Sequence, residues 1–403
     1  MNKFKYSIGY FSISSAMLLT SQQGLAAGFQ LNAQSATGLG RAFAGDAIIA
    51  DNASVISRNA AAMTLFDSAE ISFGGTYIDS SVDVPDATYT PLVGDTVETS
   101  AEDVGGSTVI PNFYYVQPLE GTNWTVGASA YSNFGTDVSF DDDFMADEFG
   151  GDTSLMSVNL GLSAAYRVND QLSLGAGLDV IHGSGEIYRK GLLDVEADGE
   201  ALGFNVGMAY EFDANNRIGL SYRFSPDLEA DGDVTMGGES ADSISIPLPD
   251  MIEFSGYHRL HEQFAMHYSL QYVKWSEFDS LTSDDLSTDI KEYKWQDAGH
   301  VSLGGTYYMN PEWELRAGYM YDMAPTDEMS SLSIPDSDRH WLSAGVSYKP
   351  TEHSTFDLGM SYIIGEEGEI DESLSVIPGT SSNIKATTDV SATTVGLQYS
   401  YKF

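Results

Sequence analysis

The sequence predicts an all-β protein, a transmembrane antiparallel β-barrel of about 14 strands. Three observations carry this prediction: a secretory signal at the start, no later apolar run long enough for a membrane-spanning helix, and many segments with apolar residues at every second position. A chain without such helices can cross a bilayer only as a closed barrel, because every backbone polar group must find a hydrogen-bond partner there.

Residues 1–26 have the features of a secretory signal peptide. Lys3 and Lys5 form a basic start, an apolar run follows, and Gly24-Leu25-Ala26 places small residues at the cleavage positions. Cleavage after Ala26 would make Ala27 the mature N-terminus, and cleavage after Ala27 is the alternative. The chain is therefore expected to be exported.

Residues 27–68 fit neither a helical nor a strand pattern. They are rich in glycine and alanine, with scattered apolar side chains and few charges. Such a segment could fold inside the barrel as a plug, or it could be a periplasmic lead-in. Composition alone leaves both interpretations open.

Residues 69–403 carry the strand signal. The interleaved positions are small or polar, which suits a lumen opposite a lipid-facing side. Six short turns alternate with seven longer polar connections, and this asymmetry distinguishes an outer-membrane barrel from a soluble β-sandwich. The last strand alternates up to Phe403, an ending that resembles the signal read by the outer-membrane assembly machinery. The clearest alternating segments are 156–168, 202–212, 218–224, 264–272, 313–321 and 395–403.

Charge and cysteine content exclude several classes of function. The chain has 59 acidic and 18 basic residues, a net charge of -41 and no cysteine. Such a charge argues against nucleic acid as a partner, and the lack of cysteine excludes disulfides and thiolate metal sites. Acidic clusters such as 141–143 and 366–367 are interpreted as solvated loops, with divalent-cation binding that bridges to lipopolysaccharide as the alternative. No metal site and no cofactor are predicted.

Several motifs, in order along nearly the whole mature chain, closely resemble the outer-membrane long-chain fatty acid transporters, the FadL family. The resemblance implies that residues 27–68 are a hatch and that the protein is a monomer of the Gram-negative outer membrane. It also implies passive transport of long-chain fatty acids or similar hydrophobic compounds. One departure is Asn59-Ala60-Ala61, where the family usually has Asn-Pro-Ala; losing Pro frees φ and restores an N–H donor, which predicts a differently anchored hatch. The matching segments are 28–32, 35–45, 50–53, 248–251, 255–257, 267–270, 333–336 and 343–345.

The same resemblance implies a pocket for the ligand. Phe29 matches the hatch aromatic that reaches into the acyl pocket, and Ile187 with Arg189 matches the family's pocket pair. A guanidinium suits a carboxylate because it can bind it bidentately; the alternative is a structural Arg189 paired with nearby acids. Gln296 stands where the family has a second basic residue, so the carboxylate site is expected to hold a single strong cation. The alternative is that Lys294 substitutes for the missing basic residue.

Two further sites are expected beside the pocket. Asn133, Phe134 and Gly135 match an inward kink that opens a lateral gap in the barrel wall of the family; a glycine at a strand–loop boundary is the plain alternative. After the kink, four apolar side chains in an acidic loop predict an exposed patch that captures acyl chains with low affinity. These are Phe140, Phe144, Met145 and Phe149.

Arg41, Asp46, Asp51 and Asn59 are expected to anchor the hatch to the barrel wall rather than to touch the ligand. No catalytic motif is present in the sequence, so no enzyme activity is predicted. The alternatives are an uptake channel for aromatic hydrocarbons, which Gln296 favours, a general porin, and a structural or adhesin barrel.

Overall fold

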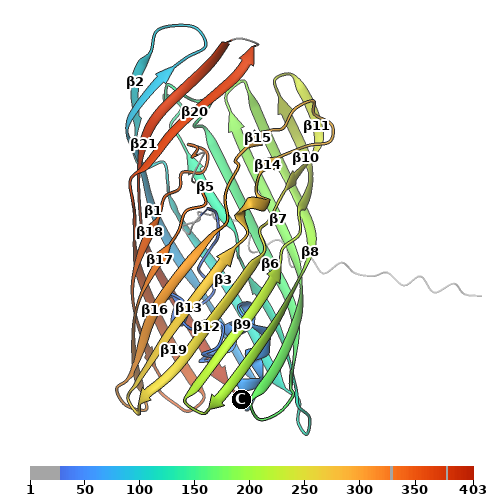
Figure 1. The fold of residues 1–403 in the computed structure, drawn as a ribbon, viewed down its shortest axis with the longest axis vertical. Coiled ribbons are helices and arrows are strands. Elements are labelled where there is room, and N and C mark those ends of the chain that lie inside the picture. Colours follow the sequence, from blue (N-terminus) through green and yellow to red (C-terminus); the bar gives the residue numbers. More distant parts are fainter. Residues whose placement is uncertain (1–27, 327–329, 378–379) are drawn as a thin grey trace, which may run out of the picture.

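The computed structural model describes residues 28–326, 330–377 and 380–403. Within them, 14 antiparallel strands form one closed barrel, in which β21 returns to pair with β1 (Figure 1). The predicted fold class is therefore confirmed, whereas the predicted signal peptide lies outside the described residues. The barrel strands are β1 (Glu70–Thr90), β3 (Ser107–Pro118), β4 (Trp124–Tyr131), β6 (Asp152–Arg167), β7 (Leu172–Arg189), β8 (Leu193–Asp213), β9 (Asn216–Phe224), β12 (Met251–His261), β13 (Phe264–Val273), β16 (Ala298–Tyr308), β17 (Trp313–Asp322), β18 (Arg339–Tyr348), β19 (Ser354–Gly365) and β21 (Thr380–Lys402).

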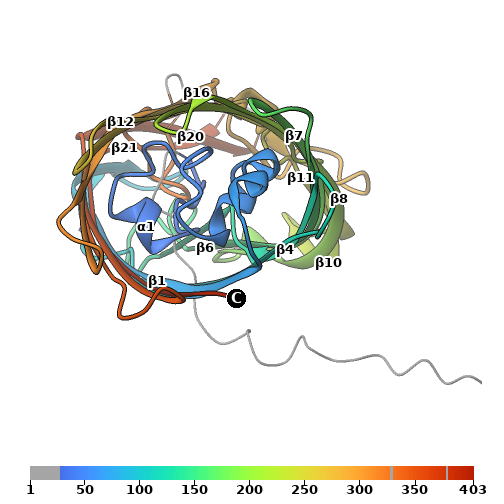
Figure 2. The same cartoon turned by 90° about the horizontal axis from the view of Figure 1, so that it is seen from below.

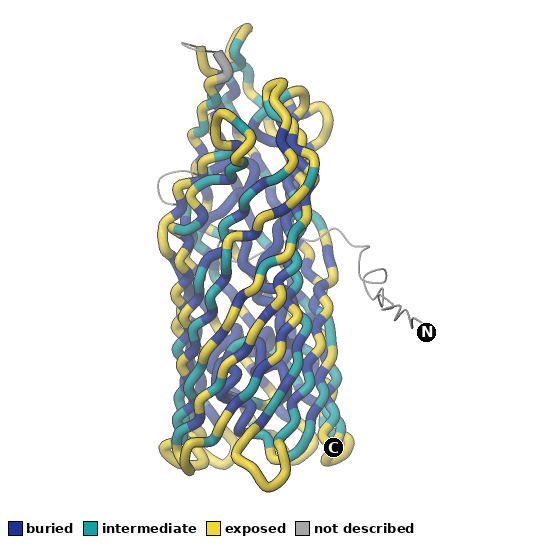
Figure 3. The backbone as a smooth tube through the Cα atoms, turned by 90° about the vertical axis from the view of Figure 1, so that its right-hand side faces the viewer, coloured by how far each residue is buried: buried dark blue, intermediate teal, exposed yellow. Residues whose placement is uncertain are grey.

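Exposed and buried residues alternate along the whole height of the strands (Figure 3). The outward residues are apolar in the lower barrel and polar in the upper barrel. In β8, Phe204 is exposed and Asn205 is buried, so this part presents an apolar outer face and a polar inner face. Nearer the start of the same strand, Val195 is buried and Glu196 is exposed. The lower barrel thus has the surface expected against lipid, and the upper barrel has the surface expected in water.

The upper part is built from extensions of barrel strands and extra hairpins. Figure 1 shows the β1–β2 and β20–β21 hairpins rising above the rim. The sequence analysis had assigned most of these residues to polar loops. The additional elements are β2 (Val97–Ala101), β5 (Gly135–Ser139), β10 (Leu228–Met236), β11 (Glu239–Ile246), β14 (Ser280–Leu281), β15 (Lys291–Glu292), β20 (Gly368–Ile377) and the short helix η3 (Trp275–Glu277).

The N-terminal segment, residues 28–69, lies inside the barrel (Figure 2). Residues 28–49 are all buried, and three short helices follow one another: α1 (Ala36–Leu39), η1 (Ala53–Ser57) and η2 (Ala60–Leu65). The residues Ser35, Asn52 and Asn59 cap them, each side chain accepting a backbone N–H of the first helical turn. None of the helices in the described part of the chain is long or apolar enough to span a bilayer.

Glycines on the inner face of the wall let the N-terminal segment pack directly against it. A Cβ at Gly318 would lie 2.1 Å from the carbonyl oxygen of Arg41, and one at Gly207 would lie 1.9 Å from the side chain of Asn59. Any larger residue at these positions would displace the segment. Close backbone approach is a common reason for glycine inside a strand.

Candidate ligand-binding site

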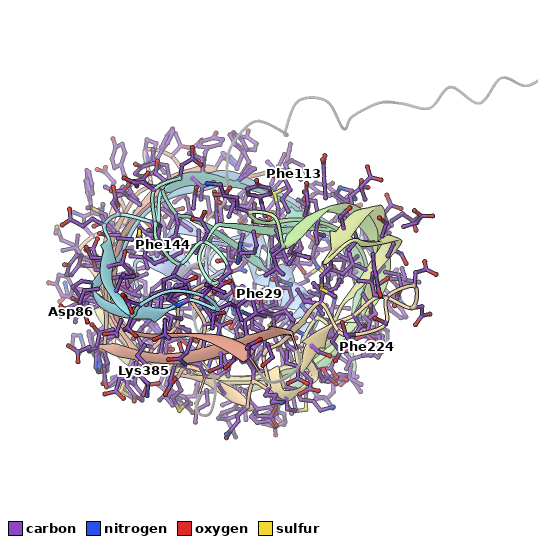
Figure 4. The ribbon with its side chains drawn as sticks, turned by 90° about the horizontal axis from the view of Figure 1, so that it is seen from above. Phe29, Asp86, Phe113, Phe144, Phe224 and Lys385 are labelled. Carbon is purple, nitrogen blue, oxygen red and sulfur yellow. The ribbon has the colours of Figure 1, made fainter. Side chains whose placement is uncertain are left out.

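Phe29 lies within the ring of strands (Figure 4) and is almost fully buried by other aromatic side chains. Its ring meets Trp275 at 4.8 Å and Phe278 at 4.9 Å between centroids, both edge to face. Phe134 and Trp295 each lie at 5.7 Å, and Tyr293 packs on Phe278 at 4.8 Å. We call these six residues the aromatic cluster: Phe29, Phe134, Trp275, Phe278, Tyr293 and Trp295.

The aromatic cluster is part of a larger apolar interior in the upper barrel. Ile187 belongs to the same buried hydrophobic cluster as Phe29, together with side chains from β6, β7, β8, β10 and β11. The structure thus brings Phe29 and Ile187 together. Further members of this interior are Leu155, Ile181, Leu193, Val195, Leu228, Ile244, Ile246 and Leu248.

Arg189 ends β7 with its side chain turned inward, and the residue is 4% exposed. Its guanidinium donates to the carbonyl oxygens of Asp152 at 2.6 Å and Tyr188 at 2.7 Å, and to the hydroxyl of Thr153 at 2.7 Å. All three acceptors are neutral. A guanidinium has five N–H donors, so two remain without a hydrogen bond within the described part of the chain.

The acids considered as structural partners of Arg189 do not reach it. Glu186 and Asp194 are both exposed, on the outer face of β7 and β8, because residues of one strand alternate between its faces. The ionisable groups that act on Arg189 electrostatically are Tyr293, Glu372 and Asp152. Arg189 is therefore a buried cation on the same inner face of β7 as Ile187, without an ion pair in the described residues.

Gln296 lies elsewhere. Its side chain is exposed and lines an acidic cleft on the outer surface with Asp297, Asp338 and Glu366. Lys294 is also exposed and pairs with Glu292. Neither side chain shares the buried interior with Arg189, although Trp295 between them points into the aromatic cluster.

The strand expected to kink bends inward at the predicted residues. β4 ends at Tyr131 and β5 begins at Gly135; between them Phe134 forms a bridge with Gln30 of the N-terminal segment. The amide of Gly135 donates to the carbonyl of Phe29 at 2.8 Å, and Leu31 donates back to Asn133 at 2.6 Å. The kink thus pairs with the N-terminal segment.

A gap in the wall follows from this bend. β3 pairs with β1 along residues 107–116, but its ladder with β4 begins only at Phe113. Within the described residues, no strand pairs with residues 107–112 on the side away from β1. The barrel wall therefore lacks one strand-to-strand ladder beside Asn133 and Gly135.

The four apolar loop residues after the kink are mostly inside. Phe140, Phe144 and Phe149 are buried, with Phe140 and Phe144 at 4.7 Å between ring centroids and Phe149 packed near Tyr89. Met145 is 56% exposed. The loop folds under the β1–β2 hairpin and joins its apolar inner face, so the expected exposed patch is reduced to one side chain.

A buried charge network ties the N-terminal segment to the lower wall. Arg41 pairs with Asp46 at 2.6 Å and with Asp51 at 2.7 Å, and Arg316 of β17 reaches Asp51 at 3.4 Å. Burial opposes ionisation of Asp51, but the charges of Arg41 and Arg316 hold the pKa of its carboxyl below the usual range. Asp51 is therefore a charged link between segment and wall.

Asn59 both caps η2 and contacts the wall. Its side-chain amide donates to the carbonyls of Ala47 at 2.9 Å and Met208 at 3.1 Å, while its oxygen accepts the N–H of Ala61 at 3.0 Å. Ala60 is the first helical residue, a position where Pro is tolerated because its N–H is not needed by the helix. With Ala60 at this position, Asn59 makes all three of these contacts.

Sequence reasoning missed most of the aromatic cluster. Trp275, Phe278, Tyr293 and Trp295 flank a stretch that was interpreted as one long polar loop. Their spacing carried the signal, since four bulky aromatic residues at the two ends of a polar loop indicate that both ends fold back into the interior.

These features define an outer-membrane β-barrel whose N-terminal segment fills its own lumen. The family described as outer membrane protein transport protein (OMPP1/FadL/TodX) matches residues 17–403, and the chain belongs to that family. It is therefore a protein of the Gram-negative outer membrane.

Known proteins resemble the chain in sequence or in fold. It is 35% identical to a long-chain fatty acid transport protein of Escherichia coli O6:H1, over 90% of this chain and 92% of that one. A Pseudomonas aeruginosa FadL homologue shares the fold with a TM-score of 0.82 at 21% identity, over 94% of this chain and 100% of that chain. The Pseudomonas putida toluene transporter TodX shares it with a TM-score of 0.63 at 18% identity, over 87% and 94% of the two chains.

Proposed function

We propose that this protein carries long-chain fatty acids across the outer membrane by passive diffusion through the barrel. Arg189 binds the carboxylate, and the apolar interior around Phe29 and Ile187 holds the acyl chain. The observation that carries the proposal is the buried Arg189 guanidinium with two donors left over. A buried guanidinium with donors to spare suits a carboxylate head group, because it can bind one bidentately.

The route follows from the position of the gap. The ligand would leave the interior sideways between β3 and the kink at Asn133, Phe134 and Gly135, after the N-terminal segment has moved as a hatch. Within this proposal residues 27–68 are the hatch, the protein acts as a monomer without catalysis, and outer-membrane lipids and lipopolysaccharide are its other partners.

Direct binding of oleate to the purified protein in detergent tests the head-group assignment. Loss of a charge-assisted pair of hydrogen bonds costs about 1.5–3 kcal/mol, so Arg189→Ala should weaken oleate binding roughly 10- to 150-fold. Oleyl alcohol, which has the chain but no carboxylate, should bind both forms alike. Arg259→Ala is the matched control, because Arg259 is an exposed arginine at the opposite end of the wall, where its guanidinium donates to the carbonyl of Glu262 in the adjoining turn.

Carriage of neutral aromatic hydrocarbons is a second candidate, favoured by the edge-to-face setting of the Phe29 ring and by Gln296 in place of a second cation. It predicts that toluene binds and that Arg189→Ala leaves oleate binding unchanged. A general porin predicts no oleate binding and a large steady current in a planar bilayer. Either result would refute the fatty acid proposal.

A further inference from the structure

Glu372 is an acidic residue on the otherwise apolar inner face of β20. β20 turns alternate side chains toward the interior of the upper barrel, where Ile370 is buried and Leu374 packs against the same apolar cluster. Glu372 lies between them on that face, opposite Ile384 of β21, which is fully buried. An apolar residue would fit this position better, because a buried carboxylate loses hydration.

The Glu372 carboxylate is held by two neighbours from other loops. One oxygen pairs with the ammonium group of Lys291 on β15, and the other accepts the hydroxyl of Ser331 at 2.8 Å. The Lys291 ammonium also donates to Ser331 at 2.9 Å. Exposed fractions of 12% for the Glu372 side chain and 21% for that of Lys291 make this a partly buried ion pair, shielded from bulk water.

This ion pair adjoins the aromatic cluster of the proposed binding site. The Lys291 ammonium lies 5.7 Å from the centre of the Tyr293 ring, which belongs to the aromatic cluster. The charges of Glu372 and Tyr293 also act on the Arg189 guanidinium. Two cations, Lys291 and Arg189, therefore share the influence of one carboxylate at the edge of the apolar interior.

We propose that Glu372 is a built-in competitor of the ligand's carboxylate. It holds Lys291 and partly offsets Arg189 until the head group of an incoming fatty acid takes its place, so that Lys291 becomes the second cation of the bound state. The inference rests on the proposed function and deepens it. This inference explains why an acidic residue stands at Glu372, which the packing of the apolar face does not explain.

The signs of two substitutions separate this role from a structural one. A competitor predicts opposite effects: Glu372→Gln removes the competing charge and should tighten oleate binding, whereas Lys291→Met removes a cation and should weaken it. A mere clasp between loops predicts effects of the same sign, since both substitutions break it. The expected change is about three- to tenfold in each direction, the effect of one charge several ångströms away in a protein interior.

The experiment is calorimetric titration of oleate and of oleyl alcohol into the full-length protein and its variants. Asp371→Asn is the matched control: it removes the same charge from the preceding residue of β20, on the outer face, where Asp371 pairs with Lys385 at 2.8 Å. It should leave oleate binding within about twofold, because exposed pairs contribute little. Lys291→Arg, which keeps the charge, should bind oleate nearly as the unmodified protein does.

The outcomes distinguish the two levels of the argument. Tighter oleate binding by Glu372→Gln, weaker binding by Lys291→Met and unchanged oleyl alcohol binding support the competitor. Effects of the same sign, or no effect of Glu372→Gln while Arg189→Ala still weakens oleate binding, overturn the competitor and leave the proposed function standing. No effect of Arg189→Ala overturns both.

Discussion

Gly318→Ala tests the packing of the N-terminal segment on the wall with a single methyl group. Gly318 lies on the inner face of β17, and its added Cβ would stand 2.1 Å from the carbonyl oxygen and 2.2 Å from the carbonyl carbon of Arg41. Ordinary contact begins at 3.4 Å, so one backbone must move away from the other. β17 is held by ladders to β16 and β18, so the N-terminal segment has to give.

That displacement has a calculable cost. It pulls Arg41 away from Asp46 and Asp51, which it meets at 2.6 and 2.7 Å. Overpacking of a close-packed interior typically costs about 1–3 kcal/mol, and we expect the free energy of unfolding to fall by that amount. The same shift should open a leak past the segment.

Urea unfolding followed by tryptophan fluorescence measures the first effect, and current through a planar bilayer measures the second. Gly75→Ala is the matched control, because Gly75 is on the outer face of β1 and the nearest atom to its added Cβ lies at 3.5 Å. If Gly318→Ala unfolds like Gly75→Ala and carries no more current, the segment does not pack on the wall as described.

Three further predictions follow from the N-terminal segment and its ties. Ala60→Pro should raise the unfolding free energy by about 0.4–1 kcal/mol, because Ala60 begins η2 after an extended residue; a lower urea midpoint would contradict this. Asp51→Ala should lower the free energy of unfolding by about 3–5 kcal/mol, because it leaves the cations Arg41 and Arg316 buried without this carboxylate. A change below 1 kcal/mol in the same urea assay would show that the network relaxes. Asp336 accepts the backbone N–H of Gly28 at 2.9 Å, and burial, opposed by the charge of Arg339, raises the pKa of its carboxyl to about 6. A carboxyl with a raised folded-state pKa stabilises most in acid and loses this contribution as pH rises, so the stability difference between the unmodified protein and Asp336→Ala should be about 2 kcal/mol larger near pH 4.5 than near pH 7.5; an equal difference at both would refute the assignment.

The lower barrel could be predicted because lipid leaves a chain little choice. Outward positions must be apolar there and the lumen is polar, so residues such as Phe204 and Asn205 alternate visibly in the sequence. Above the membrane the outward positions are acidic, and segments such as 193–198 were interpreted as part of a loop. Buried and exposed positions still alternate in these segments, but the apolar residues, such as Val195, face inward and the polar ones face outward. This is the reverse of the pattern in the lower barrel.

The candidate site was predictable only in part. The resemblance pointed to Phe29, Ile187 and Arg189 before any geometry was known, and the structure places all three in or beside one interior. It could not show that Phe144 is buried, because an aromatic residue in an acidic loop looks the same whether the loop stands in water or folds under a hairpin. Burial of this kind is decided by contacts between distant segments.

Pro111 is a feature of the sequence itself that disfavours strand pairing at the gap in the wall. It sits in the middle of β3, on the stretch that no other strand pairs with on the side away from β1 within the described residues. The ladder to β1 runs through Pro111 without a break, so the nitrogen that lacks a hydrogen must face the gap. A neighbouring strand would therefore find no N–H donor at Pro111. Across the gap, the backbone groups of Gly135 and Asn133 are already hydrogen-bonded to the N-terminal segment. Both edges are thus fixed locally, one by a proline and the other by the segment itself. In the proposed route the ligand would pass this unpaired edge of β3, and the N-terminal segment that lines it would have to move first.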